Sequence, residues 1–439
     1  SSALNNPNVT FVQLLAGAVL SGVGGGAFAS SMSNMSFFYP KTQLGYALGI
    51  NGGLGNLGVS MTQLLIPLVM GWQGGSDKLS EIVSGWPSHA GWFWWPICLF
   101  AAITGFFWLS NQPDHANHGG GLKDTLWSHF YFYWVEISGL ICASVATVVF
   151  TVSRDFFFFE TPAGQVVQRF VLVVLSVAME HAVLKWTSPR AVKESVEKQN
   201  AMFKDKHTYI MTWLYIMSFG SFIGFSGAFP QLIQEFFGYI TVAGCTIDGT
   251  FLEGGTPEHC IASDGVWGEE EFTNPNAPDV FRYAWLGACI GSLIRPFGGI
   301  LADRYGGANV TQCLIVWCVI ATICAGVIIQ KISTGRSPEA LFVWFVFLFS
   351  NLFFTVGALN GTLFRTIGVL FDRELAGPVL GWSSAIASFG AFIIPSMFNV
   401  AINAGSPQVV MYGLSAFYAS CGVLNYWYYV APGCERPGV

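Results

Sequence analysis

Few residues in this chain are suited to chemistry, and Arg295 is the most informative of them. It lies in the apolar segment FRYAWLGACIGSLIRPFGGILADRYGG, whose only acid, Asp303, follows about two helical turns later. A buried arginine costs several kcal/mol in a bilayer unless it faces a cavity or a partner. Its planar fork of donors can hold a planar oxyanion through two hydrogen bonds. Arg295 is therefore a candidate anion ligand, and the alternatives are a side chain that reaches the cytoplasmic interface or pairs with a carboxylate.

A second group of candidates mixes glycine with asparagine in the segment GYALGINGGLGNLGVS. Several glycines recur at spacings that line one helix face with small residues, namely Gly45, Gly49, Gly52 and Gly53. Close helix packing explains the glycines alone. Asn51 and Asn56 add amides that need partners in a membrane interior and can donate to a polar substrate. A glycine stripe with buried amides is typical of a moving pore.

Charged residues near helix ends are candidates for a gate. Arg365, in ALNGTLFRTIGVLFDRE, lies close to Asp372 and Arg373, which favours gating or anchoring at a cytoplasmic end over substrate contact. Asp303 and Arg304 form a short turn whose charges are suited to latch neighbouring helix ends, although a plain charged turn has the same composition. Tyr215 and Phe219 share a helix face and are suited to wall a site, but such pairs more often only pack.

Acids within the apolar segments bear on energy coupling, because a proton-driven carrier usually has one in its pathway. The segments expected to be central contain none. Glu136 and the Glu180–His181 pair occur only in the fourth and fifth apolar runs, where a peripheral polar contact is the preferred interpretation over a coupling site. Exchange of one anion for another is therefore chemically simpler than proton symport.

The sequence contains no recognisable catalytic set. The histidines are scattered, and His115 and His118 lie in a glycine-rich turn without a cysteine, which argues against a metal site. The segment NGGLGNLG lacks the Lys-Ser/Thr ending of a nucleotide-binding loop. We expect no metal, no cofactor and no enzymatic activity.

The elements that must position these residues are membrane helices. Hydrophobic residues make up 53% of the chain and charged residues 10%, whereas a soluble domain carries about 25% charged residues. A net charge of -6 gives no basic footprint and excludes nucleic acid as the expected partner. Apolar runs long enough to cross a hydrocarbon core of roughly 30 Å predict about eleven helices. The predicted spans are 11–33, 43–70, 91–109, 129–152, 166–187, 208–230, 281–301, 308–330, 340–363, 377–401 and 408–430.

Charged loops predict the orientation, because Lys and Arg are retained on the cytoplasmic side. The segment 185–206 is rich in lysine and is expected inside, whereas 235–279 is acidic, lacks Lys and Arg, and is expected outside. This alternation puts Ser1 outside and the C-terminus in the cytoplasm. Cys245 and Cys260 share the polar external loop and are candidates for a disulfide. The cysteines within apolar runs are expected to act as small hydrophobes.

Four segments together resemble the nitrate/nitrite porter family of the major facilitator superfamily. GGGAFASSMSNMSFFYPKTQLGYALGINGGLGNLGVS, residues 24–60, resembles the family's fourth and fifth helices. GWSSAIASFGAFIIP, residues 381–395, resembles its eleventh helix. LYIMSFGSFIGFSGAF and GSLIRPFGGILADRYGG are similar to its seventh and eighth. The resemblance covers about residues 1–122 and 207–439.

The resemblance implies roles for several residues. Arg295 would be the substrate arginine of the C-terminal half, and Tyr215, Phe219 and Phe28 would wall the anion site. The residues that fall on the N-terminal signature helix are Asn51, Asn56, Gly52 and Gly53.

The chain departs from the family pattern in two ways. The first three helices are absent, so the family's second substrate arginine would lie upstream of Ser1. Residues 123–206 form an inserted two-helix hairpin with a cytoplasmic linker, between an N-terminal remnant at 1–122 and a six-helix bundle at 207–439. The odd helix count and the external start without Met suggest a fragment.

The sequence thus predicts an all-α polytopic membrane protein of the major facilitator type, with about eleven transmembrane helices. The resemblance implies a monomeric carrier of nitrate or nitrite in the cell membrane that works by alternating access, through anion exchange or proton-coupled uptake. The alternatives are a carrier of another small anion, such as a monocarboxylate, and a non-transporting membrane sensor or scaffold whose buried arginine is structural.

Overall fold

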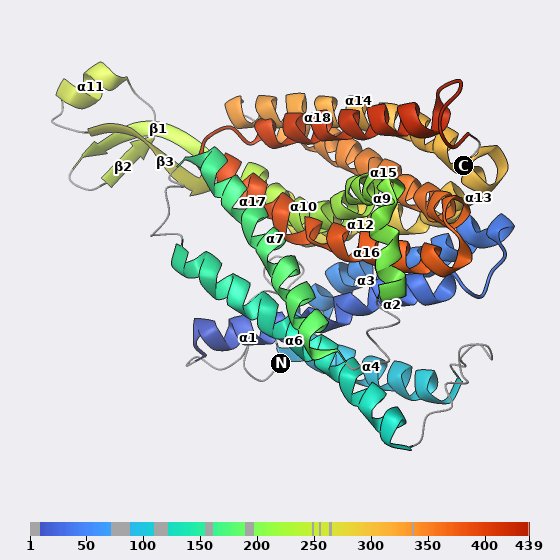
Figure 1. Cartoon of the computed structure of the whole chain (residues 1–439). Coiled ribbons are helices and arrows are strands. Elements are labelled where there is room, and N and C mark those ends of the chain that lie inside the picture. The colour runs from blue at the N-terminus through green and yellow to red at the C-terminus, as the bar shows by residue number, and fades with distance from the viewer. Residues whose placement is uncertain are drawn as a thin grey trace.

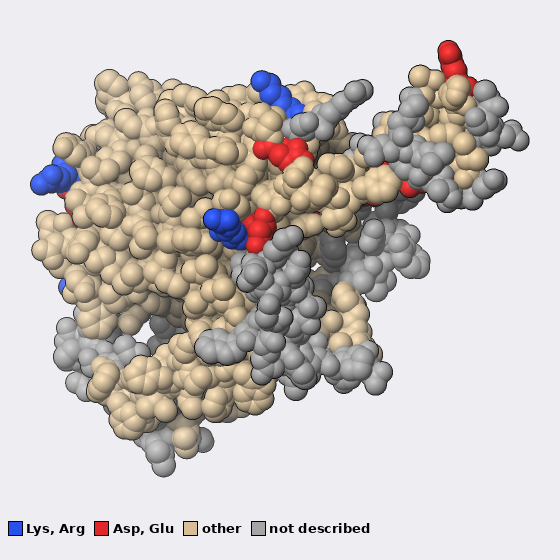
Figure 2. All heavy atoms as spheres, turned by 180° about the vertical axis from the view of Figure 1, so that it is seen from behind, with Lys and Arg blue, Asp and Glu red and all other residues tan. Residues whose placement is uncertain are grey.

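The computed structural model describes residues 9–71, 88–108, 122–153, 161–188, 197–247, 250–253, 256–262, 266–335, 338–437 and 439. These residues form long helices with one small sheet at an end of the molecule (Figure 1). Eight of the helical segments are long and apolar enough to cross a membrane. Tan, uncharged residues dominate the face seen in Figure 2, as expected for a surface that lies in lipid. The count of eleven spans stays a prediction.

The first part of the chain contains α1 (Phe11–Ser21), α2 (Val23–Met35), α3 (Leu44–Gly71) and α4 (Ser88–Trp108). A short 3₁₀ turn, η2 (Lys41–Gln43), leads into α3. Helix α3 packs against α12, α13 and α15 of the C-terminal part, and α2 packs against α16. Helices α2 and α3 therefore form the contact between the first part of the chain and the C-terminal part.

The region expected as an inserted hairpin consists of α6 (Leu122–Ser153) and α7 (Pro162–Thr187). Thr161 caps α7, because its side chain accepts a hydrogen bond from the Gly164 backbone N–H. The two helices pack on one another through polar contacts: Trp134 Nε1 donates to Thr187 Oγ1 at 2.8 Å, and Ser138 Oγ donates to Glu180 at 2.9 Å. Glu180 of α7 therefore joins the two helices.

Among its described residues, the C-terminal part contains six long helical segments, three of which are interrupted, in addition to the sheet. Its elements are α9 (Lys206–Tyr215), η5 (Ile216–Gly220), α10 (Ser221–Phe237), α12 (Val280–Leu293), α13 (Arg295–Tyr305), α14 (Gly307–Thr334), α15 (Phe342–Leu370), α16 (Arg373–Ser388), α17 (Gly390–Asn403), α18 (Gln408–Asn425) and η7 (Tyr426–Val430). Short 3₁₀ turns precede α9 and α15, namely η4 (Asn200–Lys204) and η6 (Pro338–Leu341). The segments η5 and η7 are π-helical turns.

Phenylalanine fills the core of this bundle. Phe229 of α10 stacks on Phe349 of α15 at a centroid distance of 5.4 Å and meets Phe353 edge-on at 5.9 Å. All three side chains are fully buried. Glycine lets the helices approach, because a Cβ at Gly224 would lie 2.7 Å from the Gly390 carbonyl oxygen. The two helices that meet there, α10 and α17, are thus held in backbone contact.

The segment expected as a polar external loop folds into a sheet instead. Strands β1 (Tyr239–Ile247), β2 (Thr250–Glu253) and β3 (Val266–Thr273) pair antiparallel in the order β2-β1-β3. The all-α fold class holds for the described residues apart from this small sheet, and β-branched and aromatic residues in β1 explain the strand. Cys245 and Cys260 form a disulfide that joins β1 to the short helix α11 (Pro257–Ala262).

Candidate functional site

Arg295 lies at a break between two helices in the middle of a predicted span. The span expected at 281–301 is one apolar run, but α12 ends at Leu293 and α13 starts at Arg295, with Ile294 between them. Pro296 explains the break, because proline lacks an N–H and suits the first turn of a new helix. The Arg295 side chain is completely buried. It therefore does not reach an interface.

The Arg295 guanidinium is only partly satisfied. Its Nη1 donates to the Gly52 carbonyl oxygen at 2.9 Å, whereas Nε and Nη2 have no hydrogen-bond partner. The Cζ atom lies 4.2 Å from the centroid of the Phe222 ring and 5.6 Å from that of Phe219. No carboxylate lies within ion-pair distance of Arg295 in the part of the chain that the structure describes. The charged guanidinium, with two N–H groups that lack a hydrogen-bond partner, is thus surrounded by aromatic rings.

The aromatic cluster around Arg295 contains rings from two parts of the chain. Phe28 of α2 stacks on Phe219 of η5 with a centroid distance of 4.6 Å and an interplanar angle of 11°. Tyr215 lies 5.8 Å from Phe219 and 6.0 Å from Phe364 of α15. Of the three aromatic residues that the family resemblance implies, Phe219 lies beside Arg295, and Tyr215 and Phe28 pack on Phe219. Phe222 and Phe364 were not predicted, and nothing in the sequence distinguishes them from the other phenylalanines.

The π-helical turn η5 carries Phe219. Its five residues, Ile216–Gly220, lie between α9 and α10 in what is otherwise one helix. Such single turns of π-helix frequently occur at functional sites. Tyr215 and Phe219 are four positions apart in the sequence, and both side chains are buried within the same cluster.

Small polar side chains lie behind the aromatic rings. Ser384 Oγ of α16 donates to Tyr215 Oη at 3.1 Å, and Asn360 Nδ2 of α15 donates to Ser218 Oγ at 3.4 Å. Asn360 Oδ1 and Ser292 Oγ are buried without a hydrogen-bond partner. Buried polar atoms usually have partners, so these two are acceptors or donors available to a ligand in the interior. The sequence signal for them was only small polar residues within apolar helices.

The glycines of helix α3 let its backbone lie against the backbone around Arg295. A Cβ at Gly53 would lie 2.6 Å from the Ser292 carbonyl oxygen, and one at Gly49 would lie 2.9 Å from the Pro296 Cα. Only glycine allows this backbone contact. Gly52 faces the Arg295 guanidinium, because a Cβ there would lie 3.5 Å from Nη1.

The two asparagines of α3 have different surroundings. Asn56 Nδ2 donates at 2.8 Å to the Gly52 carbonyl oxygen, the same atom that accepts from Arg295. The Asn51 amide instead donates to Ser31 Oγ and Met32 Sδ of α2, both at 3.2 Å. The structure thus places Asn56 beside the candidate site and Asn51 between α2 and α3.

The gating candidates meet near the C-terminal end of α13. Arg365 Nε lies 3.6 Å from Asp303 Oδ1, and the Tyr46 backbone N–H at the start of α3 donates to Asp303 Oδ2 at 3.2 Å. A Cβ at Gly45 would approach the Gly299 carbonyl oxygen to 3.0 Å. Arg304 is exposed, and neither the hydrogen bonds nor the ion pair of this group involve it. Asp303 therefore connects α3 to α13 and α15.

Comparison with known proteins gives clear relatives, although no family model matches the chain. The chain is 29% identical over 439 residues to the probable nitrate/nitrite antiporter NarK2 of Thermus thermophilus, a match that covers 99% of this chain and 74% of the relative. It is 27% identical over 449 residues to the nitrate/nitrite transporter NarU of Escherichia coli, covering 97% and 72%. The chain is a homologue of nitrate/nitrite transporters.

The similarity to the first two relatives extends over nearly the whole of this chain. A third relative, the nitrite extrusion protein of Bacillus subtilis, is 22% identical over 267 residues and covers 60% of this chain and 55% of the relative. The two longer matches cover at least 97% of the chain, so they span the helices that hold Gly52 and Arg295.

Proposed function

We propose that this chain carries nitrate and nitrite across the membrane, with Arg295 as the ligand of the anion. The observation that supports the proposal most directly is the buried Arg295 guanidinium with Nε and Nη2 unpartnered. An uncompensated charge in a low-dielectric interior is unfavourable, and an entering anion would neutralise it. Nitrate and nitrite are planar and can accept two parallel hydrogen bonds from the guanidinium. The names of the relatives point to the same substrates.

Aromatic walls suit such a substrate. Nitrate and nitrite are weakly hydrated anions, and the stacked rings of Phe28 and Phe219 form an apolar wall near Arg295. Phe222 lies against the guanidinium on another side and contributes a cation–π contact. Tyr215 offers a hydroxyl that already accepts from Ser384 and so keeps its own proton for an anion.

Alternating access requires that α3 can separate from the C-terminal bundle. Contacts join them near the Asp303 end and near the other end, where Ser60 Oγ donates to the Trp285 carbonyl oxygen at 3.0 Å and Gln63 Nε2 to that of Ser226 at 2.8 Å. The site is therefore enclosed in this structure. We propose that residues 207–439 move as one bundle against 1–122, that the 123–206 hairpin lies at the periphery, and that the Asp303 end and the C-terminus face the cytoplasm.

Exchange of anions is the proposed mode of transport. One relative is named a probable antiporter, and this favours exchange over coupling to protons. In an exchanger, Arg295 would be neutralised in turn by the incoming and the outgoing anion. The carrier would work as a monomer, because Arg295 and the rings around it all come from one chain.

The proposal is tested by counterflow of labelled nitrate in proteoliposomes that contain the purified chain. Arg295→Lys should abolish nitrate binding and exchange, because lysine keeps the charge but loses the two-pronged geometry. Arg282→Lys is the matched control, since Arg282 is exposed at the start of α12. Melting temperatures without ligand check that both variants fold.

The outcomes separate the alternatives. Nitrate exchange that formate or acetate displaces equally well would favour a carrier of other small anions. Nitrate binding that survives in Arg295→Lys would refute the assigned site and favour a structural arginine. Absence of any binding by the wild-type chain would refute the proposal.

A further inference from the structure

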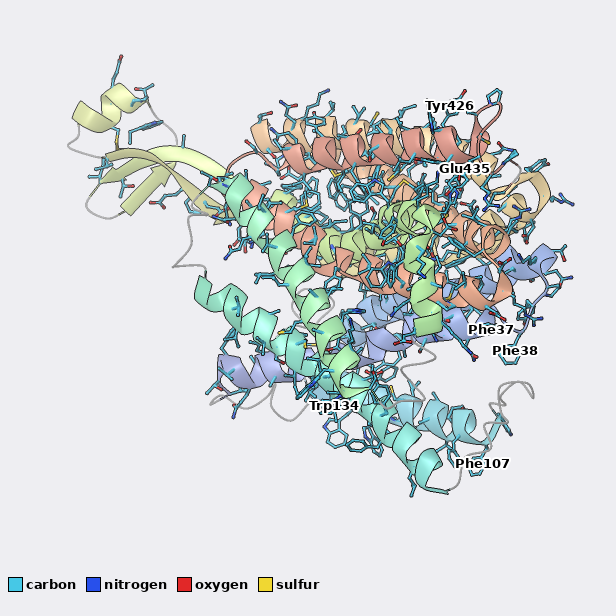
Figure 3. The ribbon with its side chains drawn as sticks, viewed as in Figure 1. Phe37, Phe38, Phe107, Trp134, Tyr426 and Glu435 are labelled. Atoms are coloured by element: carbon cyan, nitrogen blue, oxygen red, sulfur yellow. A yellow bond between two sulfur atoms is a disulfide. The ribbon has the colours of Figure 1, made fainter. Side chains whose placement is uncertain are left out.

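A polar cavity lies away from Arg295, at the end of the bundle where Asp303 connects α3 to α13 and α15. It has a volume of about 310 Å³ and lies between the turn that joins α2 to α3 and the junction of α15 with α16. Figure 3 shows Phe37 and Phe38 of this turn, and Glu435 of the C-terminal tail, at the end of the molecule opposite the sheet. The residues that line the cavity are Ser36, Phe38, Tyr39, Pro40, Lys41, Leu44, Gly368, Arg373 and Ala376.

Two cations line this cavity from opposite sides, and each reaches across it. Lys41 Nζ, from the α2–α3 turn, donates to the Phe371 carbonyl oxygen at 3.1 Å, just after the end of α15. Arg373 Nη2, from the start of α16, donates to the Phe37 carbonyl oxygen at 2.7 Å. An ammonium has three donors and a guanidinium five, so both groups keep donors free for a further acceptor.

The two positive charges have no acidic partner on the cavity wall. In the part of the chain that the structure describes, neither Lys41 nor Arg373 forms an ion pair. Asp372 and Glu374 flank Arg373 in sequence, but neither lines the cavity. Like charges that face one space repel each other, and an anion between them converts this repulsion into attraction.

We infer that this cavity binds an oxyanion that bridges Lys41 and Arg373. The apolar side of the cavity, with Leu44 and Ala376, lowers the local dielectric and strengthens such a contact. The bridge joins the α2–α3 turn to the α15–α16 junction, so a bound oxyanion stabilises closure of this end of the molecule.

The ligand is an oxyanion that can come from two sources. One is the phosphodiester of an anionic lipid, because basic pockets between membrane helices bind such headgroups. Phe38 and Tyr39 are 44% and 42% exposed beside the cations, as is typical of aromatic residues at a membrane interface. The other source is a soluble oxyanion such as phosphate or nitrate. The chemistry of the contact is the same in both cases.

The test measures the melting temperature of the purified full-length chain in nanodiscs. One series uses phosphatidylcholine alone and adds sodium phosphate or nitrate against chloride at constant ionic strength. The other replaces part of the phosphatidylcholine with phosphatidylglycerol. Each is run on the wild-type chain, on the double variant Lys41→Gln/Arg373→Gln, and on Lys198→Gln, an exposed residue that does not line the cavity. All three are also measured in an Arg295→Lys background, which removes any contribution of nitrate bound at Arg295.

We expect phosphatidylglycerol or the soluble oxyanion to raise the melting temperature of the wild-type chain and of Lys198→Gln. In the double variant, the concentration for half of the effect should rise at least tenfold. A shift with phosphatidylglycerol alone assigns the lipid, and a shift in phosphatidylcholine discs assigns the soluble ion. Equal shifts in the double variant and the wild type, or no shift in either series, overturn the inference. The result in the Arg295→Lys background stands whether or not the chain transports nitrate.

Discussion

A methyl group at Gly52 probes the candidate anion site with little change elsewhere. In Gly52→Ala the new Cβ would lie 3.1 Å from two atoms of the Phe364 ring and 3.5 Å from Arg295 Nη1. Phe364 is fully buried and packs near Tyr215, so a shift of its ring is passed on to the aromatic cluster beside Arg295. The Phe364 ring must therefore shift by a few tenths of an ångström, and we expect the guanidinium, which the methyl group meets at ordinary contact distance, to lose its fit to an anion as these rings repack.

The size of the effect follows from the contact that is lost. A hydrogen bond to a charged group contributes about 1.5–3 kcal/mol. Loss of one such bond between Arg295 and the anion corresponds to a Kd for nitrate that is roughly 10- to 150-fold higher. Alanine also favours a helix over glycine by about 1 kcal/mol, which offsets part of the free energy that the displaced ring costs.

Gly55→Ala is the matched control, because it lies on the same helix and a Cβ there would have no atom within 4 Å. Nitrate binding is measured by calorimetric titration of both variants in detergent, and unfolding by their melting temperatures without ligand. Gly55→Ala should bind as the wild type does. Equal nitrate affinities for the two variants would refute the position of the anion beside Gly52 and Arg295.

Three further predictions concern other parts of the chain. Asp303→Asn should weaken the contact with Arg365 and raise the reactivity of a cysteine introduced at Tyr46; unchanged labelling would count against a gate there. Cys245→Ser should lower the free energy of unfolding of the sheet by about 3 kcal/mol, visible as faster amide exchange in β1, while nitrate binding stays the same. The Lys206 ammonium, 2.6 Å away, holds the pKa of the Glu435 carboxyl below its usual value, so this contact of the tail persists at the ordinary pKa of glutamate and is lost as the pH falls through the lowered value. Amide exchange in the tail should show that loss, and Glu435→Gln should remove the pH dependence.

Hydropathy predicted the ends of most helices to within a few residues. A helix that crosses lipid must be apolar along its whole length, whether it faces lipid or other helices. It did not show the break at Ile294, since an interrupted helix and a continuous one have the same apolar composition. Pro296 was the available signal. The sheet of β1, β2 and β3 was not predicted, because an acidic segment outside the apolar spans is typical of a loop and the β-branched residues of β1 are the only contrary signal.

Residue chemistry predicted the centre of the candidate site better than its periphery. Arg295 was identified because a charge within an apolar run is conspicuous, and Gly52 because glycine spacing is visible. Phe222 was not, because it is one of 39 phenylalanines and its contact with the guanidinium depends on how two helices cross. Lys41 and Arg373 were also missed as a pair, since they are far apart in sequence and meet only across a cavity.

The π-helical turn η5, in the helix that carries Tyr215 and Phe219, contains one residue more than a regular α-helical turn. If the turn were to close into regular α-helix, α9 would rotate relative to α10 by about 100° and shift by about 1.5 Å, the values for one residue of an α-helix. Neither α9 nor α10 would need to unfold. The stacked pair of Phe219 and Phe28 would come apart in that movement, so one change of helical register would uncover the side of Arg295 that the two rings now shield.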